Sequence, residues 1–102
     1  MVTDSQVEIL QRLRTTQGHL GAVIEMAESG QPCEQILHQL NAVQSALRAT
    51  ALKLVLCQAE SSRVVILDSL SPNERIKELK RLQSLYAIFL RCSIRNREVI
   101  HE

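Results

Sequence analysis

The feature that most constrains how this chain folds is a long central stretch without helix-breaking residues. Between Pro32 and Pro72 there is no glycine or proline. Apolar side chains recur in this stretch at steps of three and four residues, as one face of an α-helix requires. The pattern predicts a helix over residues 32–68 that begins at the proline, a residue suited to the first helical position. The β-prone run 64–67 is taken as the end of this helix, because no partner strand is evident.

Another helix is predicted before the long one, over residues 5–29. Ser5 and Glu8 have the spacing of a capping box, in which each side chain bonds to a free backbone N–H of the first turn. Gly30 is a suitable stop, since glycine readily adopts the left-handed conformation that ends many helices.

A third helix is predicted over residues 72–98. Ser71 is its expected cap, Pro72 takes its first position and Glu74 its third. Apolar residues then follow at heptad-like spacing, with basic residues between them. The chain is therefore predicted to be a single all-α domain over residues 1–102, a three-helix subunit with a long second helix.

The length of the central helix also predicts self-association. A helix of about 30 residues is about 45 Å long, which exceeds the width of a compact domain of this size. Such a helix buries both of its faces by packing against copies of itself, so a homodimer or homotetramer is expected. Aromatic residues are scarce, with one Tyr and one Phe, and Leu, Ile, Val and Ala must fill the core.

Composition and motifs argue against several classes of protein. The net charge of +1 argues against a globally basic nucleic-acid-binding protein, although an assembled oligomer can still present a basic face. No apolar run reaches the roughly 18 residues of a membrane span. Asp4 and Glu8 stand where a secretion signal would be apolar, so a cytoplasmic location without membrane partners is expected. A catalytic triad, a phosphate loop and a supported carboxylate pair are all missing from the sequence, so an enzyme is not expected.

Cys33 is the most informative single residue. It directly follows a proline at the predicted start of the long helix, where unpaired N–H groups and the helix dipole favour a thiolate. A thiolate binds soft metal ions and reacts with oxidants or electrophiles. Cys33 is therefore predicted to be a metal ligand or a reactive thiol, and a small buried apolar residue is the alternative.

Other possible ligands are less well placed. Cys57 lies about 36 Å further along the same predicted helix. It can therefore meet Cys33 only across an antiparallel dimer, where a Cα–Cα distance within about 7 Å would permit a disulfide or a shared metal. His38 is five residues from Cys33 and points to a different side of the helix. His38 and His19 are possible additional ligands, with surface positions as the alternative. Cys57 and Cys92 sit on apolar stretches, where core packing is the default.

Three segments taken together resemble a known family: LQRLRTTQGHLG, GQPCEQILHQLNAVQSAL and the capped third helix. They resemble the CsoR/RcnR-like repressors, which sense copper, nickel or cobalt, formaldehyde or persulfide. The resemblance covers residues 7–100. It implies an antiparallel helical-bundle dimer that pairs into a tetramer and binds double-stranded operator DNA without a helix-turn-helix. It also implies that a ligand releases the DNA by altering the tetramer.

The resemblance further implies roles for individual residues. In metal-sensing members, the counterpart of Cys33 binds a metal together with two residues of the partner subunit. Counted from that Cys, a His lies 25 positions later in the sequence, and a Cys or His lies 29 positions later. Here those positions are Gln58 and Ser62, which are poor ligands for soft metals, and Cys57 is one residue away. The resemblance implies that basic residues on the tetramer face contact DNA, and we assign this role to Arg12, Arg14, Arg48 and Lys53. The alternative is that these residues form a solvated helix face.

The sequence thus leads to two hypotheses. The first is a repressor whose operator affinity is controlled at Cys33, either by a Cys33–Cys57 thiol switch between subunits or by an atypical metal site that uses the same two thiolates. Cu(I), Zn and Ni are the candidate ions. The alternative is a helical oligomerisation or partner-binding module that has lost sensing.

Overall fold

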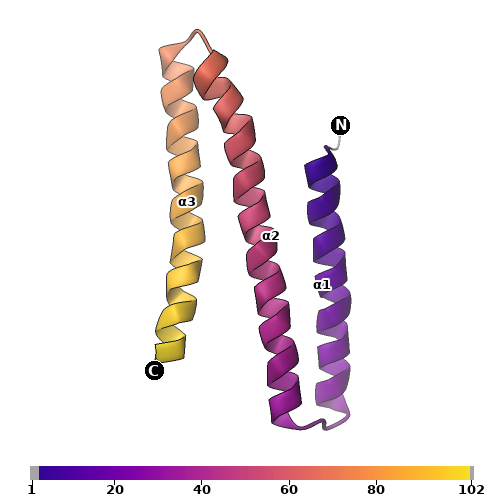
Figure 1. Cartoon of the computed structure of the whole chain (residues 1–102). Coiled ribbons are helices and arrows are strands. Elements are labelled where there is room, and N and C mark those ends of the chain that lie inside the picture. The colour runs from indigo at the N-terminus through magenta and orange to yellow at the C-terminus, as the bar shows by residue number, and fades with distance from the viewer. Residues whose placement is uncertain (1–2, 102) are drawn as a thin grey trace. The chain divides into compact units, whose positions relative to one another are not determined.

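The computed structural model describes the backbone of residues 3–101 and the side chains of residues 3–91. These residues form α1 (Asp4–Glu28), α2 (Cys33–Asp68) and α3 (Pro72–His101), as Figure 1 shows. No strand occurs among residues 3–101, so the all-α prediction is confirmed. Within the same residues, no helix has an apolar stretch of the length that a bilayer crossing needs.

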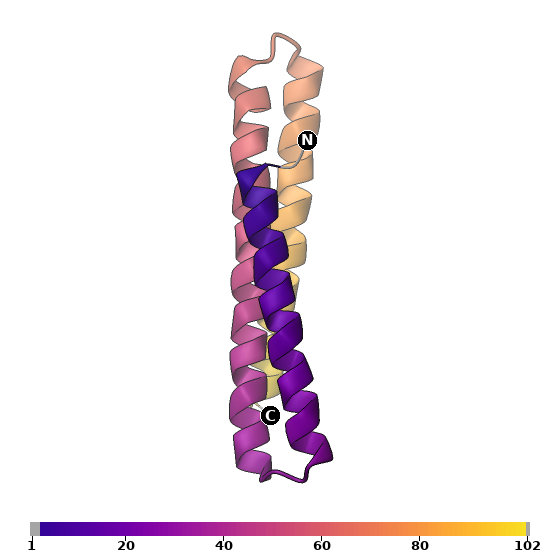
Figure 2. The same ribbon diagram turned by 90° about the vertical axis from the view of Figure 1, so that its right-hand side faces the viewer.

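The chain divides into two compact units, and α2 contributes to both. The N-terminal unit comprises residues 1–53 and the C-terminal unit residues 54–102. In Figures 1 and 2, α1 runs antiparallel to the part of α2 in the N-terminal unit. The start of α3 likewise runs antiparallel to the end of α2 in the C-terminal unit. The expectation of a single domain over the whole chain stays a prediction.

The start of α1 differs from the prediction. Thr3, rather than Ser5, is the N-cap: its Oγ1 accepts the N–H of Gln6 at 3.2 Å, and Gln6 Oε1 accepts the N–H of Thr3 at 2.9 Å. Threonine and glutamine satisfy the same capping-box pattern as serine and glutamate, and this earlier pair adds residues to the helix. The Ser5–Glu8 box was therefore wrong, and the Glu8 side chain is available for other contacts.

The turn between α1 and α2 is set by Gly30, as the sequence predicts. Gly30 has a φ of 73°, in the left-handed region. Its N–H donates to the carbonyl of Ala27 at 3.2 Å, and the N–H of Gln31 donates to the carbonyl of Met26 at 3.0 Å. This pair of bonds is a Schellman motif, which satisfies the last carbonyls of the helix.

The start of α2 lies one residue later than predicted. The carbonyl of Pro32 accepts the N–H groups of Gln35 and Ile36, at 3.0 and 3.2 Å. A residue that accepts the first intrahelical bonds without being helical itself is the N-cap, so Cys33 takes the first helical position. The β-prone run 64–67 is helical, as predicted.

The start of α3 agrees with the prediction. Ser71 is its cap, since Ser71 Oγ accepts the N–H of Glu74 at 3.4 Å and the Ser71 carbonyl accepts the N–H of Arg75 at 3.2 Å. Pro72 is the first helical residue. Glu74 also accepts a hydrogen bond from the Ser69 hydroxyl at 3.1 Å, which ties the turn to the first turn of α3.

Few side chains are buried within one chain, and they recur at intervals of seven. Ile9, Thr16 and Val23 form a heptad stripe on α1, and Val43 and Thr50 continue the pattern on α2. Each threonine hydroxyl donates to the carbonyl four residues earlier, which satisfies it inside the helix pair. The narrow stripe is typical of helices that pack as coiled coils.

Candidate functional site

Cys33 lies where the sequence places it, at the first turn of α2. Its thiol is free and exposed, and the acidic Glu34 follows it. His38 is also exposed, one turn and a half further along the helix. Among the residues described, no group of three His, Cys, Asp or Glu side chains is close enough to hold a metal ion. Cys33 therefore does not have a ligand set among the residues whose side chains the structure describes.

The His19 side chain contacts Gln39 rather than a cysteine. Its Nε2 lies 2.7 Å from Gln39 Oε1, a contact that joins α1 to α2 in the N-terminal unit. The imidazole is half-buried, and a ligand role for this histidine stays a prediction. The tautomer in which Nε2 carries the proton suits this contact, since an amide oxygen accepts a hydrogen bond.

The two thiols of the proposed switch belong to different units. Cys33 is in the N-terminal unit, whereas Cys57 is half-buried in the C-terminal unit. Their pairing across two subunits stays a prediction. Cys92, the third cysteine, lies outside the residues whose side chains are described.

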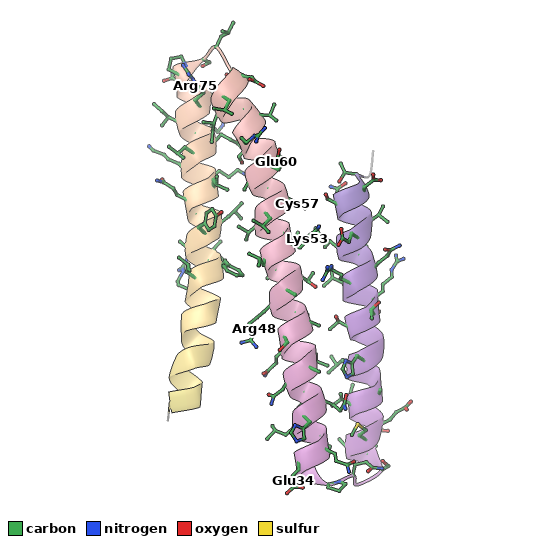
Figure 3. All side chains as sticks on the ribbon, in the orientation of Figure 1. Glu34, Arg48, Lys53, Cys57, Glu60 and Arg75 are labelled. Atoms are coloured by element: carbon green, nitrogen blue, oxygen red, sulfur yellow. The ribbon has the colours of Figure 1, made fainter. Side chains whose placement is uncertain are left out.

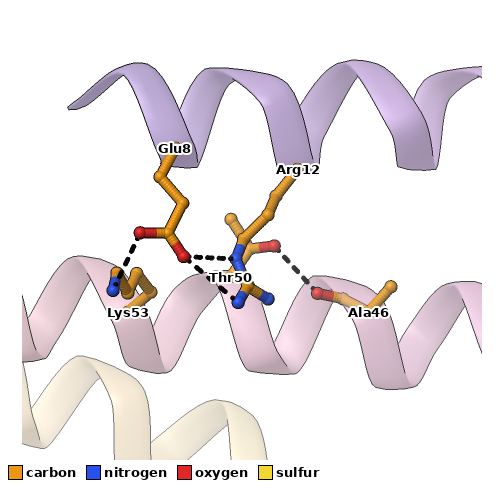
Figure 4. Close-up of polar contacts among 5 residues, drawn as sticks. All are labelled: Glu8, Arg12, Ala46, Thr50 and Lys53. Carbon is orange, nitrogen blue, oxygen red and sulfur yellow. Dashed lines mark hydrogen bonds and ion pairs between the residues drawn. The ribbon is translucent and has the colours of Figure 1, made fainter. Parts of the chain in front are cut away.

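Two of the four cations assigned to DNA meet in one surface cluster, shown in Figure 4. Lys53 Nζ lies 3.0 Å from Glu8 Oε2, and Arg12 Nη2 lies 3.3 Å from Glu8 Oε1. We call Glu8, Arg12 and Lys53 the ionic cluster. All three side chains remain between one-third and one-half exposed. An open depression of about 290 Å³ adjoins them, lined by Thr15, Thr16 and Thr50 among others.

The ionic cluster changes the acidity of its carboxyl group. The hydrogen bond and charge of Lys53, and then those of Arg12, hold the pKa of Glu8 below its usual value of 4.5. Opposite charges at hydrogen-bond distance favour the ionised form of a carboxyl group. A phosphate oxygen can satisfy the same two cations in the same way, so Glu8 occupies the groups that the predicted DNA contact would need.

The other two assigned cations lie elsewhere. Arg48 projects from α2 on the side away from α1, as Figure 3 shows, and donates to Ser45 Oγ at 3.4 Å. Arg14 is exposed and lies two residues after Arg12 on α1, so the two side chains point to nearly opposite sides of the helix. The N-terminal unit thus brings Arg12 and Lys53 together but leaves Arg14 and Arg48 on other faces.

The positions of the family's metal ligands hold a different arrangement. Ser62 Oγ donates to Glu78 Oε1 at 2.7 Å. Gln58 Nε2 donates to Ser62 Oγ at 3.1 Å and to Glu78 Oε1 at 3.3 Å. We call Gln58, Ser62 and Glu78 the hydrogen-bonded cluster. Ser62 is fully buried, whereas Gln58 and Glu78 are half-buried, and the cluster joins α2 to α3 in the C-terminal unit.

The two acids of these clusters were missed by reasoning from the sequence. The capping-box spacing predicts a capping role for Glu8, and no predicted role falls on Glu78. Signals for both exist: Glu8 and Arg12 have the four-residue spacing of a helical ion pair. Ser62 and Glu78 are each eight residues from Leu70, in the turn between two antiparallel helices, so they lie at the same level of the hairpin.

The residues at positions 58 and 62 do not fit the metal site that the resemblance implies. Soft ions such as Cu(I) are bound by thiolate, thioether or imidazole, whereas these two residues carry an amide and a hydroxyl. Both groups are already used in hydrogen bonds to each other and to Glu78. Cys33 is the one residue of the family's three positions that suits a soft metal.

Comparisons with known proteins match most of the chain to one family. The family described as metal-sensitive transcriptional repressors matches residues 5–86, which include parts of all three helices. The copper-sensing transcriptional repressor CsoR of Mycobacterium ulcerans (strain Agy99) is 46% identical over 46 residues. This similarity covers 45% of the present chain and 39% of that protein, so it spans about two-fifths of the relative's length. No solved structure matches the chain.

Proposed function

The chain belongs to the family of metal-sensitive transcriptional repressors, and on this basis we propose that it is a cytoplasmic, DNA-binding repressor whose operator affinity is controlled at Cys33. The family match over residues 5–86 carries the proposal. Members of this family are transcriptional repressors and not enzymes. Double-stranded operator DNA is the expected partner.

Exposed apolar stripes support a homo-oligomeric repressor. On α1, Leu10, Leu13, Leu20 and Ile24 are each between 41 and 51% exposed, beside the buried heptad stripe. The C-terminal unit exposes a further set: Leu56, Val64, Leu67, Ile76, Leu79 and Leu90. Buried apolar residues, by contrast, are Ile9, Val23, Val43 and Val55 among those described. A large exposed apolar surface of this kind marks an interaction site, and a second copy of the same helices has the matching pattern.

Operator binding is the first test of the proposal. Fluorescence anisotropy with the DNA upstream of the protein's own gene should show specific binding that weakens as salt rises, because cations replace counterions on the phosphates. Arg14→Ala should weaken binding while the assembly, measured by light scattering, stays unchanged. If the assembled protein does not bind this DNA at low salt, the alternative of a partner-binding module replaces the repressor. The pairing of Arg12 and Lys53 with Glu8 is the observation that favours this alternative.

Control by Cys33 needs a second experiment. The reduced protein, bound to DNA, is titrated with Cu(I), Zn(II) and Ni(II), and separately with a persulfide donor. Release of DNA by one of these reagents is expected for the wild type and should be lost in Cys33→Ser. A response that Cys33→Ser retains in full would contradict sensing at this thiol. Mass spectrometry after each titration distinguishes a bound metal from a modified or cross-linked cysteine.

A further inference from the structure

We propose that the hydrogen-bonded cluster of Gln58, Ser62 and Glu78 takes the place of soft-metal ligation at positions 58 and 62, so that no metal response runs through these two residues. The inference rests on the proposed function, because it concerns what controls the repressor. It leaves the Cys33–Cys57 pair between subunits as a separate prediction.

The Ser62 hydroxyl both donates and accepts a hydrogen bond within the cluster. Its single proton is donated to Glu78 Oε1 at 2.7 Å, and its oxygen accepts a proton from Gln58 Nε2 at 3.1 Å. The side chain has no exposed surface. A buried polar group that loses its partners keeps the full cost of desolvation. Ser62 is therefore held in this arrangement rather than open to an incoming ion.

The Gln58 side chain presents the wrong atom to a metal. Its Nε2 carries both cluster bonds, at 3.1 and 3.3 Å, and an amide nitrogen with two protons is a donor, not a metal ligand. Turning the amide to offer Oε1 would break both bonds. The new ligand would be a hard oxygen, which Cu(I) binds poorly.

Glu78 completes the cluster from the other helix. One of its oxygens, Oε1, accepts both donors, so the cluster joins α2 and α3 without any ion. Among the described residues, no buried side-chain polar atom lacks a hydrogen-bond partner. The site is thus complete as it stands, because every donor that it buries already has an acceptor.

The test measures Cu(I) affinity by competition with a chromophoric chelator, using the reduced full-length chain. Ser62→Ala should leave the Cu(I) affinity of the wild type unchanged, within about twofold. The double variant Q58H/S62C restores an imidazole and a thiol, and it should raise the affinity by at least about tenfold. Adding Cys33→Ser to the double variant should remove this gain, since Cys33 is the remaining soft ligand of the family's set.

Matched controls address the thiol and the fold. Ser61 is exposed beside the buried Ser62, so Q58H/S61C adds the same groups with the thiol facing elsewhere and should show no gain beyond that of Q58H alone, well below that of Q58H/S62C. Circular dichroism and light scattering establish that each variant keeps its helices and its assembly. If Q58H/S62C does not fold, S62C alone replaces it, with a smaller gain that also depends on Cys33.

Two results would overturn the proposal. One is a loss of tenfold or more in wild-type Cu(I) affinity on Ser62→Ala or Gln58→Ala, since these residues would then be ligands. The other is a folded Q58H/S62C variant with wild-type affinity. Operator binding by the metal-free wild type is measured on the same sample, so a failure of the proposed repressor function shows up independently of the metal result.

Discussion

The N-terminal unit joins α1 to α2 with charged side chains at the surface, whereas the C-terminal unit joins α2 to α3 with a buried hydroxyl, an amide and a carboxylate. In the ionic cluster, Glu8 lies between Lys53 and Arg12, and water reaches all three. In the hydrogen-bonded cluster, Ser62 is fully buried between Gln58 and Glu78. The two clusters make the same kind of connection, between antiparallel helices, but only the hydrogen-bonded cluster contains a fully buried polar group, Ser62.

Exposure decides what each cluster can do. Exposed ion pairs contribute little to stability, are screened by salt and exchange partners easily. We therefore expect that exchanging the partners of Arg12 and Lys53, as the predicted DNA contact requires, costs the fold little stability. A buried network is costly to break, because each lost partner leaves a desolvated group. The hydrogen-bonded cluster is accordingly expected to be a fixed part of the C-terminal unit.

The largest effect is expected from Glu78→Ala. The change removes the acceptor of both Ser62 and Gln58, and the free energy of unfolding should fall by about 2–3 kcal/mol. Glu60→Ala is the matched control, since Glu60 forms a pair with Arg63 at 3.8 Å in which both side chains are mostly exposed. The control should change the stability by less than about 0.5 kcal/mol. Urea denaturation at one fixed protein concentration measures the free energy of unfolding of both variants. Equal losses in the two variants would contradict the expected difference between the buried cluster and an exposed ion pair.

A smaller loss is expected from Ser62→Ala. The bond from Gln58 Nε2 to Glu78 remains, so part of the cluster survives and the loss should be about 1–2 kcal/mol. Ser61→Ala removes the same hydroxyl from the exposed neighbouring position and should change stability by less than about 0.5 kcal/mol. If Ser62→Ala is as mild as Ser61→Ala, the hydrogen-bonded cluster does not stabilise the C-terminal unit.

The ionic cluster is tested through DNA affinity. Glu8→Gln removes the negative charge that competes with phosphate for Arg12 and Lys53, so operator binding near 0.1 M salt should tighten by about three- to tenfold. The slope of log K against log salt should become steeper by about one. Glu25→Gln makes the same charge change at an exposed position of α1 and should have a weaker effect. Weaker DNA binding by Glu8→Gln would show that Glu8 positions these cations rather than competing for them.

The smallest effect is expected from the titration of Glu8. Its folded-state pKa is held below 4.5 by Lys53 and then Arg12. The ion pairs therefore add stability above the unfolded-state pKa, and this increment is lost as the pH falls through the lower folded-state pKa. The stability difference between wild type and Glu8→Gln should be constant from pH 7 to about pH 5 and should shrink at lower pH. Denaturation curves measured in 0.5 M NaCl should show a smaller difference throughout.

Local signals in the sequence located the helices closely. Gly30, Pro32 and the Ser71–Pro72 pair mark the ends, because each acts through the backbone geometry of its own turn. The one clear error, the cap of α1, arose where two capping patterns overlap within six residues and the earlier one prevails. The apolar periodicity likewise identified stripes on each helix, although within one chain most of those residues, such as Leu13 and Leu47, stay exposed.

The sequence alone predicts the three helices, the place of Cys33 at a helix start and the departure from the family's ligands at positions 58 and 62. The tertiary structure decided which polar groups meet. Glu8 and Lys53 are 45 residues apart, and Ser62 and Glu78 are 16 apart. Their contacts depend on the register of two helical hairpins, which is set by packing along whole helices. Helix periodicity fixes the face on which a side chain lies, but only the packed hairpin fixes its partner.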